Sequence, residues 1–293
     1  MKISANSLEA FLAVARKSNF SRAATELAIS QSALSQRILN LESQLETTLF
    51  LRDRRGSQLT PEGEELLRYA QTQESLEEEF LSSRLSSGLV GSLRVGSFSS
   101  LTRSLALPAL APLAREHGFR LSVFSRELDA LPELLRQGEA DLVILDKQLE
   151  REGVQAEFLG FEENVLVRSR KWAKKAPAFF LDHDSEDLTT QRYLQKFGHK
   201  ADNRTTVPKA GKVERRFLDE VYNLVEGVRL GLGQAVVSKH LIEDDKDLEI
   251  VEPSHVLRTG AWLHYPAQGY YPRLQLEARK AILAYGREML PQK

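Results

Sequence analysis

Apolar residues recur at helical spacing at the start of the chain. Residues 6–18 follow the i, i+3, i+4, i+7 pattern of an amphipathic helix, with the apolar positions Leu8, Phe11, Leu12 and Ala15. Residues 22–27, RAATEL, predict a short second helix that Ser21 can cap. After the turn AIS, Ser30 can cap a third helix. Two short helices joined by a three-residue turn are typical of a helix-turn-helix.

The third predicted helix, QSALSQRILNLESQL at residues 31–45, has two unlike faces. Its apolar face carries Leu34, Ile38, Leu41 and Leu45. Because residues advance about 100° each around a helix, Ser32 and Gln36 fall nearly opposite this face and Ser35 lies on its flank. Arg37 lies nearer the buried side. The polar face is either solvated surface or a surface that contacts DNA, since Ser and Gln both donate and accept hydrogen bonds.

The pattern then predicts a two-stranded wing and a long helix. Residues 49–51 and 58–60 can form short strands around the turn at 54–57. Thr60-Pro61, with acidic residues following, starts a helix that runs to about Leu85. Its narrow apolar stripe predicts pairing with another helix and consists of Leu66, Tyr69, Ala70, Gln73, Leu76, Phe80 and Leu85. Residues 86–91, SSGLVG, are expected to be a linker.

Beyond the linker the pattern alternates between strands and helices. SLRVGSF, RLSVFS and DLVILD are expected strands, separated by the expected helices at 99–118 and 129–138. A second unit of similar order follows from ENVLVRS at 163–169 to QAVVS at 234–238. A strand at 260–266 and a helix at 273–290 close the chain. This order predicts an α/β body with a mostly parallel sheet.

Composition and charge narrow the possible functions. The chain of 293 residues is 42% hydrophobic and 28% charged, which is ordinary for a globular protein of two or three domains. It has no cysteine, which excludes disulfides, thiol catalysis and thiolate metal sites. Residues 1–60 carry eight basic and five acidic residues, whereas residues 61–85 carry two basic and seven acidic ones. The basic head predicts a local anion-binding module.

These features together resemble a LysR-type transcriptional regulator over nearly the full length. The resemblance rests on F-x-x-V at 11–14, S-x-A-A-x-x-L at 21–27, SQSALSQ at 30–36, L-E at 41–42, L-F-x-R at 49–52 and LTPEG at 59–63, with matching spacing between them. GSLRVG at 91–96, GEADLVILD at 138–146 and GVRLGLGQAVVS at 227–238 resemble the effector domain of that family.

The resemblance implies a winged helix-turn-helix, a dimerising linker helix and a two-lobed α/β effector domain like a periplasmic binding protein. The expected boundaries are 1–60 for the head, 61–87 for the linker helix, 91–160 plus 263–293 for lobe I and 161–262 for lobe II. It also implies promoter DNA and a small-molecule effector as partners, a homodimer or homotetramer, and contact with RNA polymerase. We expect a cytoplasmic protein, because no secretory signal or membrane span is evident. We also expect no cofactor.

Three sets of residues follow as expectations from this interpretation. DNA contact is expected from Ser30, Gln31, Ser32, Ser35, Gln36, Arg37, Arg52, Arg54 and Arg55. Effector contact is expected at strand ends and at a helix start, from Ser99, Ser100, Thr102, Leu128, Asp129, Asp146 and Lys147. Dimerisation is expected from Leu66, Tyr69, Leu76 and Phe80.

The densest group of titratable residues, Asp182–Asp187, allows several interpretations. It can cap a helix, line the effector cleft or bind a metal ion, but neighbouring residues rarely converge on one ion, and we assign no metal ligand. No G-x-S-x-G, Walker loop or H-E-x-x-H is present, so no catalytic residue is assigned. A ligand-responsive regulator is therefore the leading function. The alternative is a small-molecule binding protein whose head only dimerises it.

Overall fold

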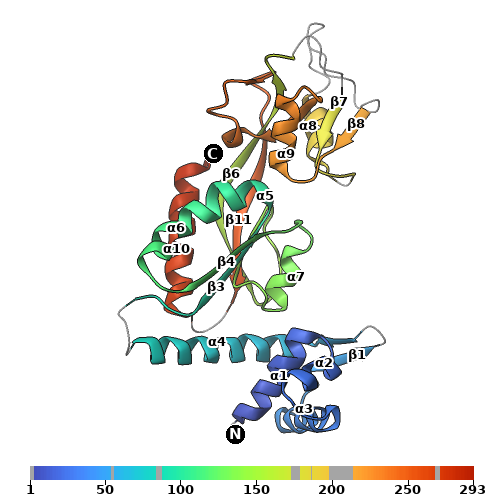
Figure 1. Cartoon of the computed structure of the whole chain (residues 1–293), viewed down its shortest axis with the longest axis vertical. Helices are drawn as coiled ribbons and strands as arrows, with labels where there is room; N and C mark the ends of the chain where they lie inside the picture. The colour runs from blue at the N-terminus through green and yellow to red at the C-terminus, as the bar shows by residue number, and fades with distance from the viewer. Residues whose placement is uncertain are drawn as a thin grey trace.

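The computed structural model of the protein describes residues 3–53, 56–83, 88–172, 179–185, 187–197, 214–267 and 271–293. These residues form a helical head, one long helix and a two-lobed α/β body, arranged along the longest axis of the molecule (Figure 1). This is the order of parts and the fold class that the sequence predicts. In the described ranges no helix has the combined length and apolar character needed to cross a membrane.

The predicted helix-turn-helix is present and consists of α1 (Ala5–Lys17), α2 (Phe20–Glu26) and α3 (Gln31–Leu45). Ser30 caps α3 as predicted, because its Oγ accepts a hydrogen bond from the Ala33 N–H at 3.1 Å. The prediction that Ser21 caps α2 is wrong. Asn19 holds the extended cap conformation, and its Oδ1 accepts a hydrogen bond from the Arg22 N–H at 3.0 Å.

The wing is an antiparallel pair of β1 (Phe50–Asp53) and β2 (Gly56–Leu59). Gly56 has a φ of +143°, and a Cβ at this position would lie 2.6 Å from the carbonyl oxygen of Ser18. The Ser57 N–H donates to the same oxygen at 3.0 Å. The ring of Phe50 packs edge-on against Phe20, with 5.7 Å between the centroids. These contacts fix the wing to the end of α1 and to α2.

The long helix α4 (Pro61–Ser83) starts as predicted at a threonine cap, since Thr60 Oγ1 accepts a hydrogen bond from the Gly63 N–H at 3.0 Å. Leu66 and Ala70 on this helix are buried in the core of the head. Leu66 was expected in a contact between subunits, but it packs within its own chain. Three other large apolar residues lie on another side of α4, namely Tyr69 (55% exposed), Leu76 (39%) and Phe80 (61%).

A third side of α4 contacts the body, and the sequence pattern does not predict this contact. The Glu64 carboxylate pairs with Arg136 Nη1 at 2.9 Å and with Arg151 Nη2 at 3.2 Å. Two turns further along, Gln71 Nε2 donates to the Gly138 carbonyl at 3.0 Å. The Glu64 and Arg136 side chains are only 14% and 17% exposed, so the pair is largely removed from solvent.

Lobe I has three parallel strands covered by helices. Its strands lie in the order β4-β3-β5. Its elements are β3 (Ser92–Ser97), α5 (Ser99–Leu101), the π-helical turn η1 (Thr102–Ala106), α6 (Leu107–Glu116), β4 (Arg120–Ser125), α7 (Leu131–Arg136), β5 (Leu142–Leu145) and α10 (Arg273–Met289). Elements α5, η1 and α6 form one continuous helical segment in place of the predicted helix at 99–118, with Pro112 inside it.

Lobe II also has three parallel strands, in the order β9-β7-β8. Its elements are β7 (Phe179–Asp182), α8 (Thr189–Phe197), β8 (Glu214–Phe217), α9 (Val221–Arg229), β9 (Gln234–Ser238), the 3-10 turn η2 (Lys239–Leu241) and β10 (Leu248–Ile250). The short strand β10 was not predicted and pairs with the end of β6.

Two long strands connect the lobes, β6 (Val154–Ser169) and β11 (Leu257–Pro266). They pair antiparallel, so the sheet of the body is mixed where the sequence predicts a mostly parallel one. The sequence pattern predicts only the second half of β6. A bulge interrupts the pairing at Ala261/Trp262, opposite Gly160, whose φ is +144°. The C-terminal segment contacts the bulge, where Gln292 Nε2 donates a hydrogen bond to the Leu159 carbonyl at 2.9 Å.

Candidate functional site

The polar face of α3 is exposed on the head. Leu34, Ile38 and Leu41 form the buried face, as predicted. The residues expected to contact DNA divide by exposure: Ser30, Gln31, Ser32 and Gln36 are exposed, whereas Ser35 and Arg37 are half-buried. This agrees with the interpretation that places Arg37 nearer the apolar side.

Several of these side chains form hydrogen bonds to one another or to neighbouring polar side chains. Ser21 Oγ donates to Gln31 Oε1 at 2.8 Å, which links α2 to the first turn of α3. Gln36 Nε2 donates to Asn40 Oδ1 at 2.9 Å, one turn further along α3. The Oγ atoms of Ser30 and Ser32 lie 3.0 Å apart. These bonds orient the polar face, and contact with a base edge would exchange them for bonds to the base.

The wing arginines are only partly described. Arg52 lies on β1 and is opposite Ser57 of β2 in the register of the wing. Arg54 and Arg55 lie outside the described residues. Contact of all three with phosphate or with the minor groove therefore stays a prediction.

A cleft of about 450 Å³ lies between the two lobes. Five of the residues expected to contact an effector line it, namely Ser99, Ser100, Leu128, Asp129 and Asp146. The cleft lies at the carboxyl ends of the parallel strands, where open α/β sheets bind ligands.

Two residues of the predicted effector set, Thr102 and Lys147, do not line this cleft. The Thr102 hydroxyl is directed to its own helix, where it donates to the Phe98 carbonyl at 3.0 Å, and it accepts from Ser125 Oγ at 2.9 Å. Lys147 is exposed just after β5. Strand-end position alone does not decide which way a side chain points.

The floor of the cleft is a polar patch on the two long strands, and its residues were missed by the sequence interpretation. Glu162 is 5% exposed and accepts a hydrogen bond from Ser238 Oγ at 2.6 Å. Beside it, Asn164 Nδ2 donates to Thr259 Oγ1 at 3.2 Å. The signal in the sequence was a run of polar residues, EEN at 162–164, directly before the apolar run VLV at 165–167.

The Glu162 carboxyl is in an unusual electrostatic environment. Burial raises its pKa, and the nearby Asp146 carboxylate acts in the same direction, against hydrogen bonds from Ser238 and Ser100 that lower it. His240 Nε2 lies 4.0 Å from Glu162 Oε1, but burial lowers the pKa of His240 to about 4. The imidazole is therefore neutral at pH 7 and does not compensate the carboxylate.

The cleft as a whole is acidic. Its described lining has two guanidinium groups, of Arg126 and Arg192, and seven carboxyl groups, of Glu127, Asp129, Asp146, Glu162, Asp184, Asp187 and Glu220. Low-dielectric walls around charges of one sign concentrate the field inside a cleft. This lining favours a ligand that carries positive charge.

The Asp182–Asp187 segment takes two of the roles considered for it. Asp187 Oδ1 accepts a hydrogen bond from the Thr189 N–H at 2.8 Å at the start of α8, and His183, Asp184 and Asp187 line the cleft. Asp182 is buried and bonded to Thr190 and Arg215, with a pKa raised by burial. Glu186 lies outside the described residues.

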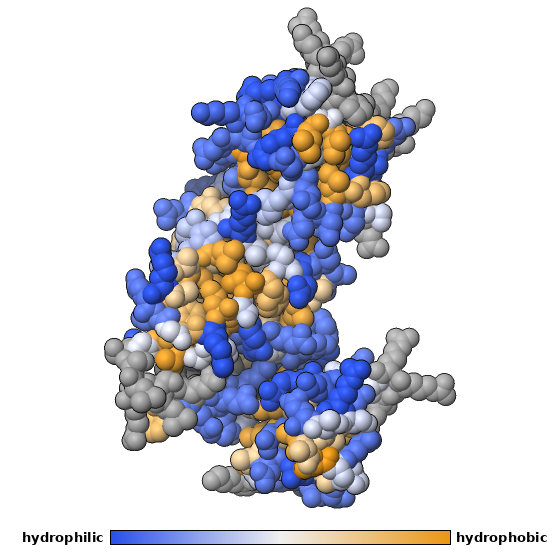
Figure 2. Space-filling model, viewed as in Figure 1, coloured by the Kyte–Doolittle hydropathy of each residue, from blue (hydrophilic) through white to orange (hydrophobic). Residues whose placement is uncertain are grey.

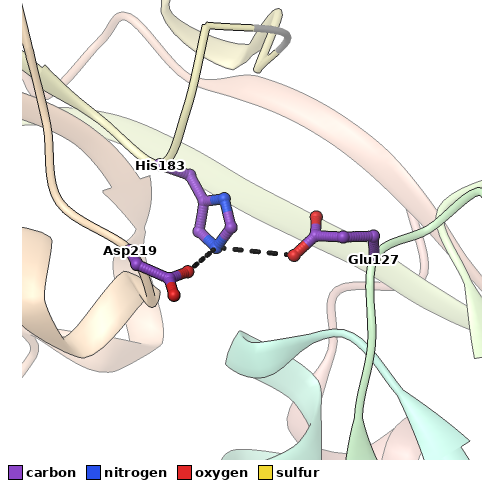
Figure 3. Close-up of side chains that lie close together, drawn as sticks. All are labelled: Glu127, His183 and Asp219. Carbon is purple, nitrogen blue, oxygen red and sulfur yellow. Dashed lines mark ion pairs between the residues drawn. The ribbon is translucent and has the colours of Figure 1, made fainter.

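His183 forms a cluster with two carboxylates at the rim of the cleft (Figure 3). Its Nε2 lies 3.1 Å from Asp219 Oδ1 and 3.8 Å from Glu127 Oε1, and its Nδ1 lies 3.2 Å from Asp184 Oδ2. Burial acts to lower the pKa of His183, but the hydrogen bond to Asp184 and the charges of Glu127 and Asp219 raise it overall.

Comparison with known proteins gives two separate matches along the chain. Residues 5–64 match the family model described as the bacterial regulatory helix-turn-helix protein, lysR family. Residues 86–285 match the LysR substrate binding domain. The two matches cover the head and the two-lobed body.

Individual relatives and solved structures agree. The RuBisCO operon transcriptional regulator of Allochromatium vinosum is 30% identical over 262 residues, which cover 83% of this chain and 82% of the relative. ArgP of Mycobacterium tuberculosis superposes with a TM-score of 0.78 at 19% identity over both whole chains. Full-length LysG of Corynebacterium glutamicum with arginine bound as effector gives 0.77 at 17% identity, over 99% and 100% of the chains.

The buried carboxyl in the floor generates a prediction about stability. Because the pKa of Glu162 is raised in the folded state, the native chain holds this proton more tightly than the unfolded chain does. Its stabilising contribution is complete below the unfolded pKa of about 4.3 and is lost as the pH rises through the folded pKa. The side chain in Glu162→Gln has no proton to lose, so this variant keeps its stability as the pH rises. Its free energy of unfolding should therefore exceed that of the parent protein between pH 4.5 and 7.5.

Thermal unfolding of the full-length protein across this pH range measures the difference. Glu163→Gln is the matched control, because a hydrogen bond from Arg258 lowers the pKa of Glu163. That carboxylate stabilises the fold above its unfolded pKa, so its replacement should destabilise the protein at pH 7.5. The same sign for both variants would contradict the assignment of Glu162 as a buried, uncompensated acid.

Proposed function

The chain belongs to the LysR family of transcriptional regulators, and we propose that its effector is a small molecule carrying a positively charged group. The head is the DNA-binding domain, and the two-lobed body is the effector-binding domain of such a regulator. The proposal concerns the class of ligand that the cleft selects and the residues that read DNA. It includes no catalytic step and requires no cofactor.

The excess of carboxylates in the cleft carries this proposal. Asp146 at the end of β5 places negative charge in the cleft, and a bound cation would favour the ionised form of Glu162 in the floor, whose pKa burial raises. A bound ammonium or guanidinium offsets the burial of these acids, which is otherwise unfavourable. The first-turn N–H groups at Ser99 and Ser100 begin the continuous segment α5–η1–α6 and suit a carboxylate. Together these groups fit an amino acid with a basic side chain.

The arginine bound to LysG supports the same ligand class, since LysG has the same fold over nearly the whole chain. The volume of the cleft, about 450 Å³, also lies within the range of small-molecule sites, roughly 300–1,000 Å³.

Thermal-shift titration of the full-length protein tests the ligand class. L-arginine or L-lysine should raise the melting temperature, and succinate should not, because it adds negative charge to an acidic cleft. A ligand at 100 times its Kd stabilises the native state by about 2.7 kcal/mol. Asp146→Asn should weaken the cationic ligand at least tenfold, whereas Glu139→Gln, an exposed acid outside the cleft, should not. Tighter binding of succinate, or an unchanged affinity in Asp146→Asn, would refute the proposal.

For DNA, we propose that Gln36 and Ser32 on the polar face of α3 contact base edges in the major groove. The N-terminal part of a recognition helix reaches the bases in this motif, and both side chains are exposed. Ser30, Gln31, Ser35, Arg37 and the wing arginines are proposed to hold the surrounding backbone.

Gln36→Ala should reduce sequence-specific affinity by about 1–3 kcal/mol, since the variant cannot form a bidentate contact with a base. Anisotropy titration against DNA from the region upstream of the gene measures this loss. Ser43→Ala, on the same face at the far end of α3, should leave the affinity unchanged. If Gln36→Ala binds specific DNA as tightly as the parent protein, the readout face is misassigned. A head that only dimerises the chain would show no specific binding at all.

We further propose that a second copy of the chain covers the exposed apolar side of α4. Tyr69, Leu76 and Phe80 are large apolar residues of α4 that are 39–61% exposed. Apolar residues also gather over α6 and the adjoining part of lobe I (Figure 2), where Leu107 is 45% exposed. Two separate interfaces of this kind would assemble a homotetramer. Contact with RNA polymerase stays a proposal that rests on the family alone.

Phe80→Asp should shift the protein from dimer or tetramer towards smaller species at micromolar concentration, because a carboxylate would be buried between two helices without a partner. Sedimentation velocity measures the distribution. The control is Leu230→Asp, the same type of change at a leucine of lobe II that is 62% exposed, which should not alter assembly. A Phe80→Asp protein with the parent distribution would remove α4 as the interface.

A further inference from the structure

Three loops from the two lobes bring one imidazole and two carboxylates together at the rim of the cleft. His183 follows β7 directly, and Asp219 lies two residues beyond the end of β8, the parallel neighbour of β7. Glu127 lies two residues beyond the end of β4, in lobe I. One ligand atom from each residue lies within 4.8 Å of the other two. Residues distant in the sequence therefore converge on one point from opposite sides of the cleft (Figure 3).

The point where they converge favours a positive charge. His183 Nδ1 is held by the Asp184 carboxylate at 3.2 Å, which fixes the orientation of the ring. Its Nε2 then faces only oxygen acceptors, those of Asp219 and Glu127. Within the described ranges, His183 is the one basic side chain at ion-pair distance from either carboxylate. A proton on Nε2 satisfies the cluster partly, and a metal cation would satisfy all three atoms together.

We propose that Glu127, His183 and Asp219 bind a first-row divalent transition metal ion, of the Zn²⁺ or Mn²⁺ class, that links lobe I to lobe II. One nitrogen and two carboxylate oxygens suit such an ion, whereas Mg²⁺ prefers oxygen ligands and water. With metal–ligand bonds of about 2.0–2.2 Å, two ligand atoms on one ion lie about 3–3.5 Å apart. The 3.1 Å from Nε2 to Asp219 fits already. The 3.8 Å to Glu127 closes with a small movement of a side chain that is 64% exposed.

The Asp184 contact is the arrangement that metal-bound histidines use. A ligating imidazole donates its second N–H to a carboxylate, which fixes the tautomer and raises the basicity of the ligating nitrogen. Asp184 therefore acts as a positioning residue for His183, without binding the ion.

Bound metal would tie the Glu127 loop of lobe I to the ends of β7 and β8 in lobe II. Because Glu127 and His183 line the effector cleft, the ion would favour the closed arrangement of the lobes and slow ligand exchange. This is a second input to the regulator, and it does not depend on which effector the cleft binds.

Isothermal titration of the full-length, untagged protein with ZnCl₂ and MnCl₂ at pH 7.5 tests the site. We expect one saturable Zn²⁺ site per chain, weaker binding of Mn²⁺ as the Irving–Williams order requires, and no competition from millimolar MgCl₂. His183→Ala and Asp219→Asn should each weaken Zn²⁺ at least tenfold, and Asp184→Asn by about 10–100-fold, as for loss of an outer-shell partner. Glu139→Gln, the same charge change at an exposed acid of lobe I outside the cleft and the cluster, should bind as the parent does.

A structural readout accompanies the titration. The radius of gyration from small-angle X-ray scattering should fall on adding Zn²⁺ to the parent protein but not to Asp219→Asn. Absence of a saturable site, or equal Zn²⁺ affinity in His183→Ala and the parent, overturns the proposal. A closure that follows pH with no effect of Zn²⁺ also overturns it, in favour of protonated His183 alone. Metal affinity is measured without DNA or effector, so its failure is distinct from failure of the proposed function.

Discussion

The antiparallel pairing of β6 with β11 is the constraint on which the rest of the effector domain depends. Both strands pass through both lobes, so the lobes share a sheet and cannot move as independent bodies. Relative motion must bend the pair, and the bulge at Ala261/Trp262 opposite Gly160 is where the ladder is already broken. The cleft floor, with Glu162 and Thr259, lies immediately beyond this bulge. A ligand on the floor would therefore lie beside this break in the ladder.

Charge determines what the cleft can accept. Burying a carboxylate such as Glu162 without a cationic partner opposes folding, and native proteins keep such groups mainly where they have a function. The neutral His240 beside it leaves the charge uncompensated. The cluster of His183 with Glu127 and Asp219 repeats this arrangement at the rim, where acceptors again outnumber donors. The two proposals thus place cations at two depths of the same cleft, beside a buried acid below and at an exposed cluster above.

The helix α4 joins the effector domain to the DNA-binding head. Its three sides have different surroundings. One side completes the head core, a second exposes Leu76 and Phe80, and a third holds Arg136 of lobe I through Glu64. Because Glu64 also pairs with Arg151, and Arg136 with Glu133, this contact is a network of charges that holds the two parts in one orientation. A change in lobe I can therefore reach the head through a single helix that also lies at the proposed subunit interface.

The sequence by itself determined the elements whose signal is local. Side-chain periodicity placed α1, α3 and α4, small polar residues placed the caps Ser30 and Thr60, and the alternation of strands and helices predicted both lobes. These features depend on neighbours within about one helical turn or one strand, so a linear pattern contains them.

Only the tertiary structure decided which side chains meet. Glu162 and Ser238 are far apart in the sequence, yet they share a hydrogen bond because β6 pairs with β9. Thr102 satisfied the positional rule for the cleft and points elsewhere, since a carbonyl of its own helix lies closer. The opposite case is His183, whose neighbours Glu127 and Asp219 come from the loops that follow two other strands. Strand order and register set these distances, and they arise from long-range pairing that no local pattern records.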